Sequence, residues 1–203
     1  MKEYQYIAPL YDILLYPFVK RIRCDVLKIV LDMRPQNVLD VACGTGDQLR
    51  LLQENGIAAV GVDMSEAMLR VCRRSNPASD CLLQDGTAMA FQDQCFELVM
   101  VSFALHEAGW ETAQSILLEI QRVLKPAGCL LLVDYTDFQK TPFYVRHTIR
   151  LIEFMAGRRH FRNFCRYHQK GGLKSLIDQD RFHSLASYPH ASQSISIQLF
   201  KVV

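Results

Sequence analysis

Short apolar runs alternate with amphipathic stretches along most of the chain. The apolar runs are bounded by turn-forming residues and predict buried strands at 37–42, 57–64, 79–86, 95–105 and 129–136. Between them, apolar residues recur every three or four positions, which predicts helices at 47–55, 65–75 and 112–124. Alternating strands and helices with short connections are typical of a Rossmann-like, doubly wound parallel sheet with helices on both faces.

The two ends of the chain depart from this alternation. Residues 10–33 have the pattern of an amphipathic helix, which we expect Pro17 to divide into two pieces. Beyond Pro142, two helical patterns enclose a basic, aromatic stretch at 158–170. Two alternating segments, 181–190 and 194–203, predict an antiparallel strand pair at one sheet edge.

These elements predict an α/β fold with three α/β/α layers around a mostly parallel, seven-stranded sheet. We expect one domain over residues 1–203, since no linker divides the chain. Its expected parts are an N-terminal helical cap (1–33), a core (34–136), a helical lid (137–180) and terminal strands (181–203).

Composition narrows the class of protein. The 203 residues are half apolar with a net charge of +2, which argues against nucleic acid or an anionic membrane as the main partner. No apolar run approaches the roughly 20 residues of a membrane-spanning helix, and the first residues do not resemble a signal peptide. Seven cysteines are scattered singly, and neither they nor the histidines show metal-ligand spacing. We therefore expect a cytoplasmic protein without a metal site.

The stretch VLDVACGTGD, at 38–47, places a glycine turn between a strand and a helix. Such a turn binds ligands beyond the carboxyl ends of parallel strands. A triphosphate loop needs Lys-Ser/Thr after its second glycine, whereas Asp47 and Gln48 follow here. A dinucleotide fingerprint needs a third glycine where the chain has Leu49, which weakens that alternative without removing it.

Acidic residues end three successive predicted strands. Asp40 precedes the glycine turn, Asp63 ends the second strand and Asp85 follows the third. Each taken singly also fits a turn or cap residue. As an ordered set, they favour a ligand with an ammonium and a carboxylate, a ribose and an adenine. Asp40 suits the ammonium, the glycine N–H groups the carboxylate, Asp63 the ribose and Asp85 the adenine amino group.

Four segments carry a resemblance to a known family. VLDVACGTGD, VGVDMSEAML, QDGTAMAFQDQCFELVMVSFALHE and EIQRVLKPAGCLLLVD lie in order over residues 37–134. Together they resemble class I S-adenosylmethionine-dependent methyltransferases, most closely the ubiquinone/menaquinone biosynthesis (methyltransferase type 11) branch. Ala42, Ala90 and Ala127 depart from the usual family pattern, at positions where it often has glycine, proline and glycine. None of the three removes a charged contact.

The resemblance implies S-adenosyl-L-methionine as cofactor, with S-adenosyl-L-homocysteine as product, and a small-molecule acceptor that is aromatic or lipophilic. Transfer would be an in-line displacement at the methyl group. The implied cofactor residues are Asp40, Ala42, Gly44, Gly46, Asp63, Met64, Asp85, Gly86, Thr87 and Ser102. The alternatives are a non-catalytic S-adenosylmethionine-binding protein and an NAD-type oxidoreductase.

The acceptor side is less defined by sequence. His106, after the fourth predicted strand, is the candidate general base, although capping or orienting a loop is the more common role of a histidine at such a position. Phe103 and His160 are candidate acceptor-binding residues, as are Tyr6 and Tyr11 of a segment that resembles the family's cofactor-covering segment. The basic stretch at 158–170 favours an acceptor-binding lid over RNA binding, given the weak net charge. The sequence does not define the oligomeric state.

Overall fold

The computed structural model describes the backbone of residues 4–136, 138 and 141–203, and the side chains of these from residue 19 onward. A seven-stranded sheet has the order β3-β2-β1-β4-β5-β7-β6. Its strands are β1 (Val38–Val41), β2 (Ala59–Asp63), β3 (Cys81–Leu83), β4 (Phe96–Ser102), β5 (Leu124–Tyr135), β6 (Phe182–His190) and β7 (Ile195–Val202). The first five are parallel and β7 is antiparallel to both neighbours, which confirms the predicted fold class.

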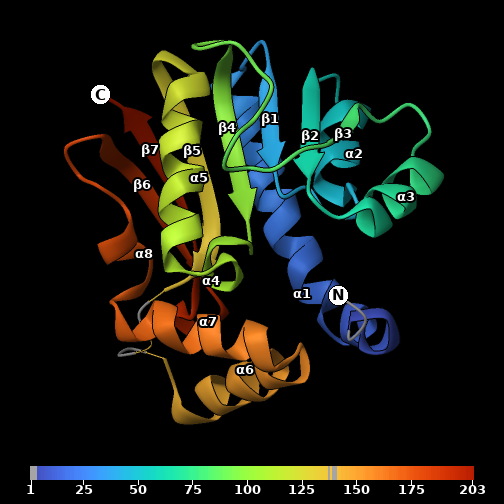
Figure 1. The fold of residues 1–203 in the computed structure, drawn as a ribbon, viewed down its shortest axis with the longest axis vertical. Coiled ribbons are helices and arrows are strands. Elements are labelled where there is room, and N and C mark those ends of the chain that lie inside the picture. Colours follow the sequence, from blue (N-terminus) through green and yellow to red (C-terminus); the bar gives the residue numbers. More distant parts are fainter. Residues whose placement is uncertain (1–3, 137, 139–140) are drawn as a thin grey trace.

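Helices surround the sheet and extend past one of its ends. They are α1 (Tyr4–Met33), α2 (Asp47–Glu54), α3 (Glu66–Ser75), α4 (Leu105–Ala108), α5 (Trp110–Val123), α6 (Phe143–Met155), α7 (Arg158–Gln169) and α8 (Gly172–Leu176). Helix α5 covers one face, and α1 passes behind the sheet (Figure 1). Helices α6 and α7 lie beyond the carboxyl ends of β4 and β5 (Figure 1). Because parallel α/β sheets bind ligands at that end, these helices border the expected site.

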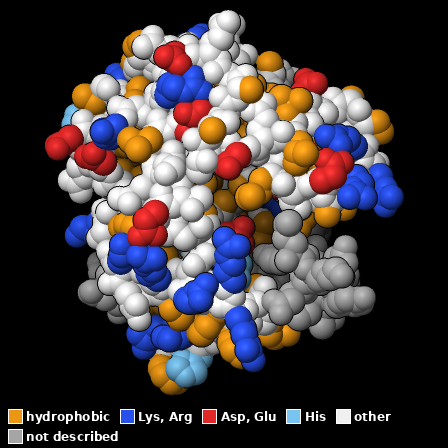
Figure 2. Space-filling model, viewed as in Figure 1, with side chains coloured by type: hydrophobic (Ala, Val, Ile, Leu, Met, Phe, Trp, Pro, Cys, Tyr) orange, Lys and Arg blue, Asp and Glu red, His pale blue; other side chains and the backbone are white. Residues whose placement is uncertain are grey.

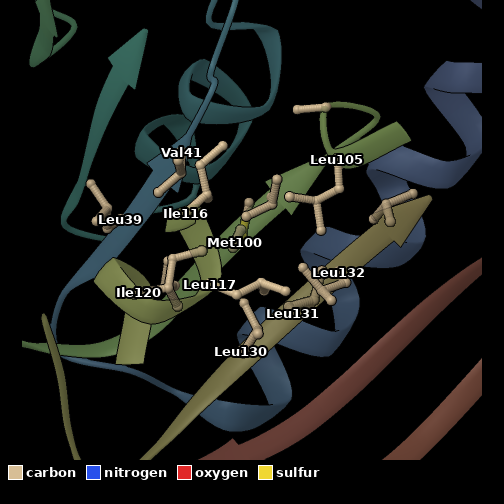
Figure 3. Close-up of a cluster of buried hydrophobic side chains, with 14 of the residues drawn as sticks. Leu39, Val41, Met100, Leu105, Ile116, Leu117, Ile120, Leu130, Leu131 and Leu132 are labelled. Carbon is tan, nitrogen blue, oxygen red and sulfur yellow. The ribbon is translucent and has the colours of Figure 1, made fainter. Parts of the chain in front are cut away.

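The core lies between the sheet and its covering helices. Val41 on β1, Leu132 on β5 and Ile116 and Ile120 of α5 belong to one cluster of buried apolar side chains (Figure 3). Leu130, Leu131 and Ile120 are fully buried. Such continuous apolar strands are expected in a sheet covered on both faces. The core fixes the strand ends that carry the site.

Two local predictions were wrong. Helix α1 continues through Pro17 rather than dividing there. Proline removes one backbone hydrogen bond, and the long helix is held by Ile22, Val26 and Val30, which are buried in the core. Strand β5 begins at Leu124 rather than at residue 129, because Leu124 already pairs with Phe96 of β4. Residues 125–128 form an irregularity before the next pair, Leu98–Cys129.

The stretch at 158–170, expected only to be a basic lid segment, is largely helix α7. Phe164 and Tyr167 of this helix are buried, whereas its four arginines are exposed. Lys and Arg side chains accordingly gather on the surface over α7 (Figure 2). Among the described residues, no helix is both long and apolar enough to cross a bilayer.

Candidate functional site

A cavity of about 220 Å³ lies at the carboxyl end of β1 and β4. Five of the predicted site residues line it, namely Asp40, Ala42, Gly44, Ser102 and Phe103. Helix α1 closes another side with Val19, Ile22, Arg23 and Val26. The sheet therefore places its topological switch point, between β1 and β4, against α1. The sequence had assigned the start of this helix to the cofactor cover through Tyr6 and Tyr11, but it had not predicted that residues 19–26 line the cavity.

The glycine turn is shaped by left-handed backbone. Gly44 and Gly46 have φ of +55° and +75°, a region that side-chain-bearing residues disfavour. A Cβ on Gly46 would lie 2.2 Å from Cys72 Sγ, so glycine is also required there for packing. Ala42 has φ of +59°, which explains why the family pattern often has glycine at this position.

The N–H groups of the two glycines in this turn donate to acceptors within the protein. Gly44 N–H donates to Asp63 Oδ2 at 2.8 Å, and Gly46 N–H donates to the Cys43 carbonyl at 2.9 Å. Both donors thus have acceptors within the protein, and their predicted role toward a ligand carboxylate stays a prediction. Arg23, which sequence patterns did not predict, also lines the cavity. One guanidinium nitrogen, Nη1, donates to Asp47 Oδ2 at 2.7 Å, and the guanidinium carries further N–H groups.

Asp40 is the buried acid of the cavity. Burial raises the pKa of Asp40 to about 7, with the Asp63 charge acting in the same direction and Arg23 opposing both. A buried carboxylate with a raised pKa is stabilised by a cationic partner. This environment suits a ligand ammonium group.

The other two acids lie outside the cavity lining. Asp63 ends β2, and its Oδ1 accepts from Ser65 N–H at 2.8 Å. Asp85 Oδ1 accepts from both the N–H and the hydroxyl of Thr87 at 2.8 Å, which lowers the pKa of Asp85. The N–H of Thr87, one of the implied cofactor residues, therefore has an acceptor within the protein. Met64 is 74% exposed and free to cover a flat ligand.

A second polar group lies beyond the ends of β4 and β5 and is almost completely buried. His106 of α4 donates from its backbone N–H to Asp134 Oδ2, and its Nδ1 lies 2.6 Å from Asp134 Oδ1. Its Nε2 lies 3.6 Å from Glu153 Oε2 of α6. His160 of α7 contacts the same oxygen through Nε2, and its Nδ1 lies 2.9 Å from Glu107 Oε2.

Charge controls protonation in this group. Burial lowers the pKa of His106, but Asp134 and Glu153 outweigh that effect and leave it well above its usual value. Burial also lowers the pKa of His160, but Glu107 and Glu153 outweigh this effect and raise the pKa to about 9. For Glu153, burial raises the pKa, and the two histidines reverse this and lower it.

These surroundings disfavour His106 as a general base. A base needs a free lone pair near neutral pH and access to its substrate. His106 is 3% exposed, both ring nitrogens face carboxylates, and its pKa is raised. His160 is 11% exposed at its side chain, so the predicted acceptor contact is also limited.

Two groups of sequence candidates remain, the N-terminal tyrosines and the basic stretch at 158–170. The side chains of Tyr6 and Tyr11 lie outside the described residues. On α7, Arg166 pairs with Glu111 at 2.6 Å, and Lys170 Nζ lies over the Trp110 ring at 4.8 Å. Part of the basic stretch therefore makes contacts within the protein.

The sheet order and the strand-end cavity define a class I methyltransferase fold. Residues 39–132 match the family model described as a methyltransferase domain. A demethylmenaquinone methyltransferase of Renibacterium salmoninarum is 30% identical over 181 residues, 86% of this chain and 76% of that protein. The corresponding protein of Thermus thermophilus is 32% identical over 165 residues, 74% of each chain.

Solved structures agree in fold. A protein of Pyrococcus horikoshii matches with a TM-score of 0.70 over 92% of each chain, at 18% identity. A SAM-dependent methyltransferase of Methanosarcina mazei matches with a TM-score of 0.63 over 82% of this chain and 92% of that one, at 14% identity.

The chain belongs to the class I S-adenosylmethionine-dependent methyltransferases. Its cofactor is S-adenosylmethionine, and the NAD-type and non-catalytic alternatives are set aside. The cavity fits this group chemically, because a buried carboxylate and a guanidinium meet in it, as a ligand with both an ammonium and a carboxylate requires.

Proposed function

We propose that the protein transfers the methyl group of S-adenosylmethionine to a small aromatic or lipophilic acceptor. The methionine end of the cofactor occupies the cavity, with its ammonium on Asp40 and its carboxylate on Arg23. Asp63 accepts the ribose hydroxyl groups through lone pairs left beside its two backbone donors. Met64, Asp85 and Gly86 bind the adenine, and Ser102 lies by the methionyl chain. The buried position of Asp40 is the observation that carries this assignment.

Bound S-adenosylmethionine supplies a methyl group already activated on a sulfonium. The protein's residues need only hold the acceptor in line with that methyl group and exclude water. Phe103 lines the cavity beside Ser102 and its backbone is held by donation from its N–H to the Val133 carbonyl at 2.7 Å. This places an apolar ring at the end of β4, where an acceptor ring can pack.

Apolar side chains on the lid support the acceptor class. Phe143, Tyr144, Leu151 and Phe154 of α6 are all more than half exposed. Together they form an apolar face suited to a lipophilic molecule. The relatives named for demethylmenaquinone, at about 30% identity, fit the same class.

Calorimetry with S-adenosylmethionine tests the cofactor site. Because an ionised Asp40 is required, we expect affinity to rise roughly tenfold from pH 6 to pH 8, as a group of pKa about 7 ionises. The variant Asp40→Asn should bind weakly and lose this dependence. Equal affinity of the variant and the wild type at both pH values would overturn the assignment.

Methyl transfer to a panel of quinols, phenols, amines and thiols tests the acceptor. We expect product with the apolar quinols and phenols, measured by mass spectrometry against S-adenosylhomocysteine formed. Turnover confined to polar amines or thiols would contradict the proposed acceptor class while leaving the cofactor site intact.

A further inference from the structure

Three helices bring metal-binding side chains to one point beyond the sheet. His106 of α4, Glu153 of α6 and His160 of α7 each offer one ligand atom, and these atoms all lie within 4.8 Å of one another. Sequence patterns did not reveal this cluster, because the three residues share no ligand spacing. We propose that His106, Glu153 and His160 form a binding site for a divalent transition-metal ion, with Zn²⁺ as the best-matched ion.

The ligand types suit zinc. Two imidazole nitrogens and one carboxylate oxygen are a common zinc ligand set, and tetrahedral bonds of about 2.0–2.1 Å keep ligand atoms about 3.3 Å apart. His106 Nε2 and Glu153 Oε2, at 3.6 Å, are already close to this spacing. The closer contact of His160 Nε2 with the same oxygen opens by a small rotation of the Glu153 carboxylate.

The surrounding residues orient the ligands as in established metal sites. Asp134 binds Nδ1 of His106, and Glu107 binds Nδ1 of His160, so both Nε2 atoms face Glu153. A carboxylate on the far nitrogen fixes the imidazole tautomer and orientation and raises its basicity toward a metal. The Tyr135 hydroxyl donates to Glu153 Oε1 at 2.7 Å and holds the third ligand.

Charge and burial define the role of the ion. Three carboxylates, Asp134, Glu153 and Glu107, surround the two imidazoles, and a divalent cation takes the place of the imidazole protons that these carboxylates stabilise. The side chains of His106, Glu153 and His160 are 3%, 1% and 11% exposed, which shields the ion from solvent. Because its ligands come from α4, α6 and α7, the ion would stabilise the packing of the lid helices on the core. Its role is therefore structural and does not include binding the acceptor.

Zinc binding to the purified full chain tests the proposal. The protein is stripped with a chelator, and Zn²⁺ affinity is measured by competition with a chromophoric chelator, with bound metal counted by mass spectrometry. We expect one tightly bound ion per chain, and at least tenfold weaker binding for Glu153→Gln and His160→Asn. Glu107→Gln, which removes a partner of a ligand, should weaken binding about tenfold.

His147→Asn is the matched control, since His147 is exposed on the same helix as Glu153 and lies outside the cluster. It should bind zinc like the wild type. A second readout is thermal unfolding, where zinc should raise the midpoint of the wild type and of His147→Asn but not of His160→Asn. No tight binding, or equal affinity in all variants, as scattered cysteines would give, overturns the proposal.

Discussion

The two polar regions at the carboxyl end of the sheet are built in opposite ways. On the cofactor side, Asp63 and Asp85 accept mainly from backbone N–H groups within their own or the adjacent loop. The side chain of Asp85 is exposed to solvent. On the lid side, His106, Glu153 and His160 bind one another from three helices and are buried. Apart from the buried Asp40, the cofactor side keeps its carboxylates in open loops, whereas the junction between lid and core buries them.

This difference has an energetic consequence. Loop carboxylates near water contribute little to folding until a ligand arrives. Buried ion pairs are costly to break, because the remaining partner is left as an uncompensated charge. Substitutions on the lid side should therefore change stability, and those on the cofactor side should change binding.

The largest effect is expected for Glu153→Ala. This substitution leaves two imidazoles and the Tyr135 hydroxyl without their shared partner. We expect the free energy of unfolding to fall by about 3–5 kcal/mol, measured by urea denaturation in chelator. The exposed acid Glu66→Ala on α3 is the control and should lose less than about 1 kcal/mol. An equal decrease in the free energy of unfolding for both variants would contradict the proposed stabilising role of the lid cluster.

Next comes Asp63→Ala, tested by calorimetry with S-adenosylmethionine. Loss of the charge-assisted bonds to the ribose should weaken cofactor binding by about 1.5–3 kcal/mol. Asp80→Ala removes an exposed carboxylate beside the amino end of β3, away from the site, and should bind normally. The binding is compared at a temperature where each variant is shown to be folded. Unchanged affinity of Asp63→Ala would refute its proposed role.

Stability of the chelator-treated protein should depend on pH through the lid cluster. The pKa of His160 is raised to about 9 from an unfolded value of 6.5, so its stabilisation is complete below pH 6.5. It is lost as the pH rises through 9, with a decrease of about 2–3 kcal/mol in the free energy of unfolding. His160→Gln should flatten this profile, and the exposed His183→Gln should not. A flat wild-type profile between pH 6.5 and 9 would contradict the pairing.

The smallest effect concerns backbone strain in Ala127, whose φ is +63°. Ala127→Gly should stabilise the protein by about 0.5–1 kcal/mol, because glycine adopts this conformation without the Cβ penalty. The reverse change Gly44→Ala, at φ +55° with open space around the new Cβ, should cost about 1 kcal/mol. Thermal unfolding measures both, and a destabilised Ala127→Gly would show that strain is not the controlling factor.

Sequence patterns predicted most of the fold. Every strand of the sheet and the helices after β1, β2 and β4 were found from periodicity, since the core imposes it directly on neighbouring residues. The predictions were wrong where one local signal was read alone. Pro17 did not divide α1, and the segment before Cys129 joined β5, because packing of the longer element outweighed the local turn tendency.

The cofactor site was similarly accessible to sequence reasoning. Asp40, Gly44 and Ser102 end short strands or follow them directly, so their neighbourhood in the chain predicts their neighbourhood in space. Arg23 was missed, because it reaches the cavity from α1 across the molecule. The one available signal was that this arginine lies on the apolar side of an amphipathic helical pattern.

The sequence alone determined the sheet, its glycine turn and the row of acids, because each depends on residues close together in the chain. Tertiary structure decided which N–H groups remain available to a ligand. It also decided that His106 joins a buried ionic cluster instead of standing free. Such a cluster depends on where α6 and α7 dock, and docking is set by packing between distant segments that no local pattern records.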